Sequence, residues 1–285
     1  SAPYTVMTNP VWGSTYSVSG LSIIQGTMEE EPTRTDATKS SAGIRGVELT
    51  IQRQDTGQFW DGSVWGSQVW LTTSAGGVGT WQRTTNLPAW EHNVSYWFVA
   101  RSSDKATNIE GAFEIKTDSI TALFDLRAAT ASFTNFISST ANQGPYVSSN
   151  TTLGPFYLNP TISFLAGTAV DAPADISTVT VAISSNNGSG FSWYNGSGFN
   201  SDFSSNTTIY RTTSSYTEAS PNDSWEYDFN NIISSSLMHG ATYLVRVRTA
   251  DWATPQNVRA EDFRFIYDAF APTATITFPA NDFST

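Results

Sequence analysis

Residues 96–104 read YWFVARSSD, and residues 243–251 read YLVRVRTAD. Each stretch begins with tyrosine, continues with mainly apolar side chains and ends with aspartate. A match between such distant segments indicates a structural unit that occurs twice, and an internal repeat constrains the fold more strongly than a single motif does. The two stretches therefore predict the same strand in two copies of a repeat.

Further blocks recur in the same order along both copies. Residues 44–51 (IRGVELTI) and 176–183 (ISTVTVAI) alternate apolar with polar side chains, as a β-strand with one buried face does. The spacing between matched blocks varies, so insertions and deletions fall between strands, where loops accommodate them. The remaining matches are a Gly-Thr pair at 26–27 and 167–168, an aromatic turn segment at 59–63 and 194–197, and a tryptophan at 81 and 225.

The composition favours folded domains outside the cell. The 285 residues are 39% hydrophobic and 13% aromatic, which is enough for a core in each of two sandwiches. Charged residues make up 14%, below the roughly 25% of an average soluble domain. The net charge of −11 argues against nucleic acid as a partner, because no basic stripe exists to release counterions from phosphates. The sequence has no cysteine for disulfides or thiolate sites, and no apolar run approaches the roughly 18 residues of a membrane span.

Two features resemble immunoglobulin-like and fibronectin type III-like domains. Trp90 precedes Tyr96 at the same spacing at which Leu237 precedes Tyr243. This pattern resembles the tyrosine corner, in which the hydroxyl bonds to backbone a few residues upstream. The segments DKATN and DWATPQN, which begin at the aspartates that end the two opening stretches, are similar to the Asp-x-Ala-Gly-Asn turn of bacterial Ig-like repeats, although both lack its glycine.

Two shorter motifs resemble the same kind of repeat. FWDG at 59–62 and YNG at 194–196 resemble the Tyr-Trp-Asn-Gly motif of repeats in very large bacterial surface and secreted proteins. GTAVD at 167–171 matches a Gly-Thr-x-x-Asp element, whereas in GTMEEE at 26–31 we expect the acid later or at a different place. The resemblance implies an architecture rather than a function, because such folds host many roles.

The expected fold is all-β, with two tandem immunoglobulin-like β-sandwich domains plus the first strand of a third repeat. The predicted domains are residues 1–124 and 125–267, with roughly seven strands each. Residues 119–129 and 230–238 are the runner-up candidates for helix, although neither has a clean 3.6-residue period.

Residues 268–285 are expected to form a linker and the first strand of a further repeat. The segment APTATITFP at 271–279 resembles APYTVMTNP at 2–10. Two explanations stay open: the chain is a window from a longer array, or the tail strand is donated to a neighbouring molecule. Both imply repeats arranged head to tail in a filament or stalk.

Groups suited to catalysis are sparse, and we predict no enzyme activity, no catalytic residue and no cofactor-binding residue. His92 and His239 occupy matching places beside the corner tyrosines, where a structural role outweighs metal binding or acid–base catalysis. No Gly-x-Ser-x-Gly elbow is present, and no acid pair matches between the copies as the carboxylates of a glycosidase cleft would.

Calcium is the one cofactor that the acidic residues leave open. Residues 29–31 with Asp36 could supply carboxylate ligands, as could Asp125 and Asp268 at the repeat junctions. None of them shows the spaced pattern of a recognised calcium loop. Solvated loops and ordinary turns are therefore the favoured interpretation, and no metal ligand is predicted.

Trp65 and Trp70 are the candidates for sugar stacking, because exposed indoles pack against sugar rings. The favoured alternative is that these rings fill a core or cover a hairpin. Trp81 and Trp225 match between the copies and are assigned to the core.

Six Asn-x-Ser/Thr sequons are candidates for glycan attachment in a secreted chain, although a sequence so rich in Asn, Ser and Thr also produces them by chance. They lie at Asn93, Asn150, Asn187, Asn195, Asn206 and Asn222.

The predicted function is that of a non-catalytic structural or adhesive module of an extracellular filament, surface layer or giant cell-surface protein. Its partners would be neighbouring copies of the same repeat or subunit, with glycans or a host or cell surface left open. The alternative is a carbohydrate-binding or accessory module of a secreted polysaccharide-active enzyme.

Overall fold

The computed structural model describes residues 2–30, 42–77, 79–134, 156–158, 164–186, 191–201, 209–219, 222–228 and 236–275. Among these residues, no helix is both long and apolar enough to cross a membrane.

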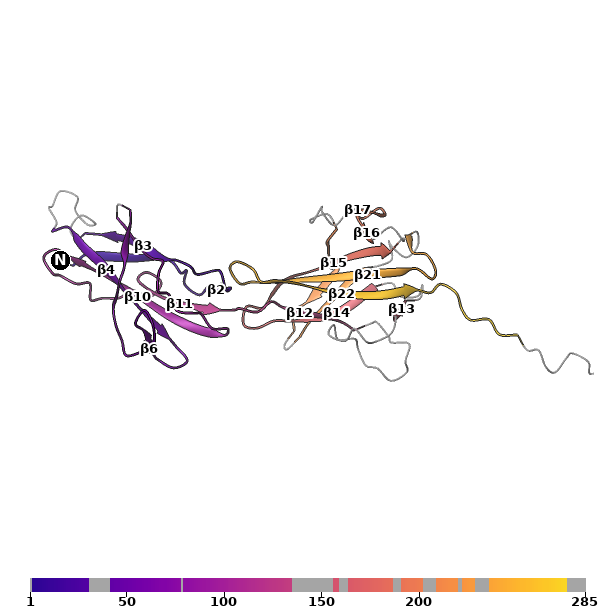
Figure 1. Cartoon of the computed structure of the whole chain (residues 1–285), viewed down its shortest axis with the longest axis horizontal. Coiled ribbons are helices and arrows are strands. Elements are labelled where there is room, and N and C mark those ends of the chain that lie inside the picture. The colour runs from indigo at the N-terminus through magenta and orange to yellow at the C-terminus, as the bar shows by residue number, and fades with distance from the viewer. Residues whose placement is uncertain are drawn as a thin grey trace, which may run out of the picture. The chain divides into compact units, whose positions relative to one another are not determined.

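Two sheets form the first β-sandwich (Figure 1). The smaller sheet has the strand order β1-β3-β9-β8. The larger sheet has the order β2-β11-β10-β4-β5-β6, and β7 pairs with β4. The strands are β1 (Tyr4–Asn9), β2 (Thr15–Tyr16), β3 (Ile24–Glu29), β4 (Ile44–Arg53), β5 (Phe59–Trp60), β6 (Trp65–Gly66), β7 (Leu71–Thr72), β8 (Ser74–Gly77), β9 (Thr80–Arg83), β10 (Val94–Asp104) and β11 (Ser119–Phe124).

The second β-sandwich also consists of two sheets. The smaller sheet has the order β12-β14-β20-β19, and the larger has β13-β22-β21-β15-β16-β17, with β18 paired to β15. The strands are β12 (Thr130–Phe133), β13 (Phe156–Leu158), β14 (Phe164–Val170), β15 (Ile176–Asn186), β16 (Phe191–Tyr194), β17 (Phe199–Ser201), β18 (Arg211–Thr212), β19 (Ser215–Thr217), β20 (Asp223–Asp228), β21 (Thr242–Asp251) and β22 (Val258–Tyr267).

The two sandwiches have the same topology, strand for strand. Replacing β1 to β11 by β12 to β22 converts the first pair of sheet orders into the second. The matching stretches 96–104 and 243–251 lie in β10 and β21, which pair with β4 and β15 in the larger sheets. The predicted internal repeat and the all-β, immunoglobulin-like fold are therefore confirmed.

A glycine beneath an indole fixes the smaller sheet of both sandwiches. Gly26 lies opposite Trp81 in the β3–β9 pair, and Gly167 lies opposite Trp225 in the β14–β20 pair. Each indole N–H donates at 3.2 Å to the carbonyl of the threonine that follows the glycine. Both tryptophans are 1% exposed, so they belong to the core as predicted.

The tyrosine corner is present in both copies. The Tyr96 hydroxyl accepts a hydrogen bond at 3.1 Å from the backbone N–H of Glu91, five residues upstream. The Tyr243 hydroxyl accepts the matching bond from Met238 at 2.8 Å. In the first sandwich the Trp90 ring also stacks on the ring of Phe124 in the core.

One runner-up expectation is wrong. Residues 119–129 do not form a helix, because β11 occupies Ser119–Phe124 and pairs with β10 along its length. Within 230–238, residues 230–235 lie outside the described residues. Residues 268–275 form no strand, and the rest of the expected third-repeat strand lies outside the described residues.

The chain divides into two compact units that do not coincide with the two sandwiches. The first unit comprises Ser1–Ala129, Val170–Thr178 and Thr249–Arg259, and the second comprises Thr130–Ala169, Val179–Arg248 and Ala260–Thr285. Two loops that follow strands of the second repeat thus belong to the first unit. The predicted domain boundaries stay predictions.

Replacing Gly26 by alanine tests the glycine–indole packing. A Cβ at this position would lie 1.9 Å from the Val6 carbonyl oxygen and 2.7 Å from the Trp81 indole nitrogen. The first atom belongs to the backbone and the second to a buried ring, so we expect Gly26→Ala to lower the free energy of unfolding by about 3 kcal/mol. Gly46→Ala is the control, because nothing lies within 4 Å of a Cβ there, and its effect should stay within about 0.5 kcal/mol. Denaturant unfolding followed by tryptophan fluorescence measures both, and equal losses would refute the packing argument.

Candidate metal centre

Three aspartates that are distant in sequence meet in the first compact unit. One carboxylate oxygen from each of Asp125, Asp171 and Asp251 lies within 4.8 Å of the other two. Asp125 follows β11, Asp171 follows β14, and Asp251 is the last residue of β21. All three belong to the first unit, because it includes the loops Val170–Thr178 and Thr249–Arg259. The ends of strands therefore position every carboxylate of this acidic cluster.

Asp125 is held by backbone groups from two segments. Its side chain is fully buried. Its Oδ1 accepts a hydrogen bond from the Arg127 N–H at 3.0 Å, and its Oδ2 accepts one from the Ala174 N–H at 2.9 Å. The bond to Ala174 joins the residue after β11 to the loop that carries Asp171. Each oxygen has a second lone pair that these bonds do not use.

Asp251 is held by its own loop. It is 0% exposed, and its Oδ1 accepts hydrogen bonds from the N–H groups of Ala253 at 3.0 Å and Asn257 at 2.9 Å. Its Oδ2 accepts the side-chain amide of Asn257 at 2.7 Å. The same amide nitrogen lies 3.0 Å from the carbonyl oxygen of Asp125 and 3.2 Å from that of Arg127. Asn257 thus ties the turn after β21 to the backbone that follows β11.

Asp171 is the least satisfied member of the cluster. Among the described residues, its Oδ2 is buried without a hydrogen-bond partner. Burial raises the pKa of Asp171 to about 7, and the neighbouring carboxylates of Asp125 and Asp251 raise it further in the same direction. The carboxyl group therefore exchanges its proton near neutral pH, far above the range of an ordinary aspartate.

The donor set fits a hard divalent cation. Calcium takes oxygen ligands at about 2.3–2.6 Å, and three carboxylates that converge within 4.8 Å place oxygens at the required separation. A cation there would bind the unpartnered oxygen of Asp171 and remove the repulsion that raises its pKa.

The sequence pointed to one member of this cluster. Asp125 was among the candidate calcium ligands, whereas Asp171 and Asp251 were recognised only as ends of repeat motifs. Asp268, another candidate, lies in the second unit with its side chain 44% exposed. Of residues 29–31, Glu29 is exposed and Glu30 is buried; Glu31 and Asp36 lie outside the described residues.

The expectation about the acid in the first copy is wrong. Because Gly26 and Gly167 contact equivalent tryptophans, they occupy the same position in the two sandwiches. Counting onward from them places Glu30 where the second copy has Asp171. The acid of the first copy is therefore Glu30, whose side chain is one methylene longer than that of Asp171.

The two histidines have matching structural surroundings. The His92 Nδ1 accepts a hydrogen bond from the Leu126 N–H at 3.3 Å and lies 3.2 Å from the Asp125 Oδ1. The His239 Nδ1 accepts one from the Ala269 N–H at 3.1 Å. In each copy the imidazole joins the tyrosine corner to the segment that follows the last strand, which is the structural role expected from the sequence.

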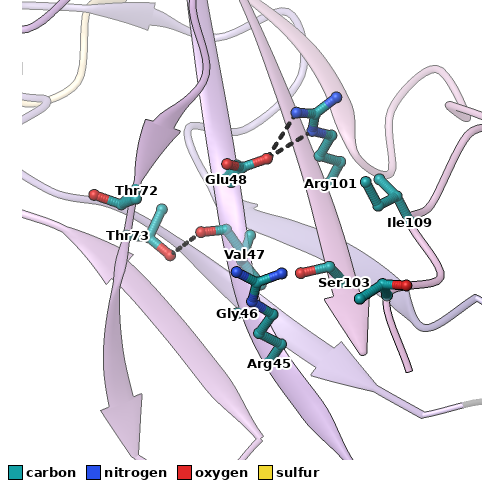
Figure 2. Close-up of a pocket in the computed structure, with 10 residues that line it drawn as sticks. Arg45, Gly46, Val47, Glu48, Thr72, Thr73, Arg101, Ser103 and Ile109 are labelled. Atoms are coloured by element: carbon teal, nitrogen blue, oxygen red, sulfur yellow. Dashed lines mark hydrogen bonds and ion pairs between the residues drawn. The ribbon is translucent and has the colours of Figure 1, made fainter. Parts of the chain in front are cut away.

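A second candidate site is a pocket on the larger sheet of the first sandwich. It has a volume of about 390 Å³, and Figure 2 shows residues that line it on the paired strands β4 and β10. Among the lining residues, Glu48 accepts a hydrogen bond from the Arg101 guanidinium at 2.9 Å, and Arg45 and Ser103 line the pocket as well.

Trp70 borders this pocket through Arg101, whereas Trp65 packs elsewhere. The Arg101 guanidinium carbon lies 3.8 Å from the centroid of the Trp70 ring. The Trp65 ring lies 5.1 Å from Trp60 and 5.8 Å from Tyr96, against the core of the sandwich. Sugar stacking on Trp65 and Trp70 stays a prediction.

Three of the six sequons fall on described residues. Asn93 and Asn222 are exposed, and Asn195 is partly buried, with its Oδ1 accepting hydrogen bonds from Ser197 and Gly198. Glycan attachment stays a prediction. The remaining sites, Asn150, Asn187 and Asn206, lie outside the described residues.

No protein-family model matches the sequence, and no curated protein does. Among solved structures, the chain is similar to a Ca²⁺-stabilized adhesin that helps an Antarctic bacterium bind ice, at 14% identity and a TM-score of 0.34, over 95% of this chain and 50% of that one. It is also similar to a 1.5-MDa bacterial ice-binding adhesin, at 11% identity and a TM-score of 0.33, over 94% of this chain and 64% of that one. A third similarity is to the FN1–FN3 domains of chicken CNTN1, at 10% identity and a TM-score of 0.29, over 93% of this chain and 66% of that one. The chain thus spans about half to two thirds of the length of these proteins, and similarities this weak leave its binding partners open.

Asp171→Asn tests the electrostatics of the acidic cluster in the absence of divalent cations. A carboxyl whose pKa is raised in the folded state stabilises the fold below its ordinary pKa of 3.8, and this contribution is lost as the pH rises through about 7. Because the asparagine carries no charge, we expect the variant to be more stable than the parent above pH 7, on the order of 2 kcal/mol, and to lose this advantage toward pH 4. Thermal unfolding across this range in a chelating buffer measures the difference.

The control is Asp61→Asn. Asp61 accepts hydrogen bonds from Ser63 and Val64, and these bonds lower its pKa. Asparagine already occupies the matching turn of the second copy at Asn195. This variant should gain no stability at high pH, and a gain equal to that of Asp171→Asn would refute the assignment of the raised pKa to the cluster.

Proposed function

We propose that this chain is a non-catalytic structural or adhesive module of an extracellular filament or giant cell-surface protein, in which repeats are joined head to tail and calcium stiffens the joints. The observation that carries the proposal is the acidic cluster, in which carboxylates that follow β11 and β14 and end β21 converge within 4.8 Å inside one compact unit. A cation bound there would hold the loops Val170–Thr178 and Thr249–Arg259 against the segment that follows β11.

The duplicated sandwich supports a mechanical role. Long antiparallel pairs such as β4–β10 share many hydrogen bonds, and chains of such domains resist extension as a series of similar elements. The acidic, cysteine-free composition is compatible with a secreted chain that needs no disulfide. A joint made by a cation would supply the stiffness that a flexible linker lacks.

Calcium is the cation that this site fits best. The available ligands are carboxylate and carbonyl oxygens, which hard cations prefer, and the nearby His92 nitrogen already accepts a backbone hydrogen bond. Calcium also tolerates irregular coordination, whereas magnesium demands a near-ideal octahedron. When all three carboxylates are ionised, their total charge of about −3 exceeds the charge of a divalent cation by one.

Calcium should raise the thermal stability of the chain. A ligand at one hundred times its dissociation constant adds about 2.7 kcal/mol to the stability of the state that binds it. We expect a calcium-dependent increase in Tm that weakens as the pH falls below about 7, because the Asp171 carboxyl must lose its proton to bind. Differential scanning calorimetry with calcium and with chelator measures the shift.

Asp251→Asn and Asp175→Asn form a matched pair for this experiment. Asp251 is buried in the cluster, whereas Asp175 is exposed in the loop that carries Asp171. We expect the first variant to lose the calcium response and the second to keep it. A parent chain that shows no calcium response at neutral pH would overturn the calcium part of the proposal.

A second candidate function is glycan binding at the pocket on β4 and β10. Arginine and hydroxyl groups line this pocket, and such groups supply hydrogen-bond donors for a sugar. This candidate corresponds to a carbohydrate-binding or accessory module of a polysaccharide-active enzyme.

Arg45→Ala tests this candidate on a glycan array. Arg45 is exposed and lines the pocket, so its loss should weaken any glycan bound there at least tenfold without disturbing the fold. Arg127→Ala is the control, since Arg127 is also exposed but lies next to the acidic cluster. Glycan binding that survives Arg45→Ala would place the sugar elsewhere on the chain. An array on which no glycan binds would rule out this second function and leave the structural role as the only candidate.

A further inference from the structure

The first sandwich repeats two of the three acidic positions. Glu30 follows β3 as Asp171 follows β14, and Asp104 ends β10 as Asp251 ends β21. Glu30 is 7% exposed, and neither of its carboxylate oxygens has a hydrogen-bond partner among the residues that the structure describes. A buried carboxylate without partners is costly unless a proton or a cation neutralises it. The first sandwich thus has counterparts of Asp171 and Asp251 at the ends of the matching strands.

The turn after Asp104 repeats the hydrogen bonds of the turn after Asp251. Asp104 accepts the Asn108 N–H at 2.8 Å and the Asn108 side-chain amide at 2.6 Å. Asn257 makes the same two bonds to Asp251, and its amide nitrogen also donates to the carbonyls that follow β11. Asn108 is exposed instead. We call Glu30, Asp104 and Asn108 the acceptor corner.

The end of the second sandwich repeats the other part of the cluster. His239 lies 3.3 Å from the Asp268 Oδ1, as His92 lies 3.2 Å from the Asp125 Oδ1. The surroundings differ in one respect, since the side chain of Asp268 is 44% exposed and that of Asp125 is 0% exposed. We call His239 and Asp268 the donor corner.

Exposed apolar side chains surround the donor corner. Met238 is 65% exposed and Phe270 is 70% exposed, and the Phe270 ring lies 4.3 Å from the His239 ring. Large apolar groups beside an exposed carboxylate and imidazole are typical of a surface that another protein covers.

We infer that the donor corner of one copy of this chain docks on the acceptor corner of a second copy. Asp268 then takes the place that Asp125 has in the acidic cluster, next to Glu30 and Asp104. The Asn108 amide donates to the carbonyl of Asp268, as Asn257 donates to that of Asp125. The inference rests on the proposed function in one respect, because a calcium ion must join the three carboxylates to offset their repulsion.

The docking differs from strand donation by the tail, because it uses side chains and a turn rather than a sheet edge. Each copy has one corner of each kind, so the contact is heterologous and builds open linear assemblies. The affinity between separate copies is expected to be weak, because a short linker supplies millimolar effective concentration that separate molecules lack.

Sedimentation velocity of the whole chain in calcium, up to about 1 mM protein, tests the inference by complementation. The parent should form oligomers of increasing length. Asp268→Asn removes the carboxylate of the donor corner, and Asp104→Asn removes a carboxylate of the acceptor corner. Each variant keeps one intact corner, so each should stay monomeric by itself. Their equimolar mixture should form a dimer and nothing larger, and chelator should dissociate it.

Glu30→Gln repeats the acceptor test at a side chain that makes no hydrogen bond among the described residues, so a defect in the Asp104 turn cannot imitate the result. Its mixture with Asp268→Asn should again give only dimers. A parent that stays monomeric, or oligomers that persist in both single variants, would overturn the docking. The calcium-dependent Tm of the same samples reports the Asp171 cluster separately, so a parent with a calcium response but no assembly leaves the proposed function standing.

Discussion

Electrostatic repulsion among three carboxylates is the constraint on which this arrangement depends. At separations near 4.8 Å and an effective dielectric constant of about 20, each pair of charges costs on the order of 3 kcal/mol. Backbone N–H groups and the Asn257 amide donate hydrogen bonds to the carboxylates of Asp125 and Asp251. Among the described residues no donor reaches the Asp171 Oδ2, and burial together with the neighbouring carboxylates raises the pKa of Asp171. A site in which two carboxylates have donors and a third keeps an unpartnered oxygen is suited to a cation.

The same constraint explains why two loops of the second repeat belong to the first compact unit. The Ala174 N–H and the Asn257 amide reach the residue after β11, and the Thr254 N–H donates to the Thr15 carbonyl at 2.9 Å. The contacts are polar and directional, so a change in charge at the cluster affects the contact between the two loops and the first sandwich more than either core.

The sequence predicts the sandwiches well, because their determinants are local and periodic. Alternation marks β4 and β15, and the spacing before Tyr96 and Tyr243 marks the tyrosine corners. A tryptophan that occurs at the same place in both copies indicates a core position. The run at 119–129 was ambiguous as helix or strand because it is short and apolar, and pairing with β10 decides it.

The acidic cluster could not be predicted in the same way, because its members lie at strand ends separated by more than 40 residues. No periodic pattern connects Asp125 with Asp171. Glu30 and Asp171 each lie four residues after a matched glycine, and the pairing of Gly26 with Trp81 and of Gly167 with Trp225 supports this correspondence.

The difference between matched positions is more informative than their likeness. Asp125 and Asp268 each lie beside a histidine, yet the side chain of Asp125 is fully buried and that of Asp268 is 44% exposed. Asn257 binds carbonyls beyond its own turn, whereas Asn108 is exposed. In each pair, the member with extra contacts belongs to the acidic cluster or binds it, and the other belongs to the donor corner or the acceptor corner. Because the local geometry of the donor corner and the acceptor corner is already formed, the docking of a second copy would cost little conformational entropy. The specificity of that contact would then come from the arrangement of its charges.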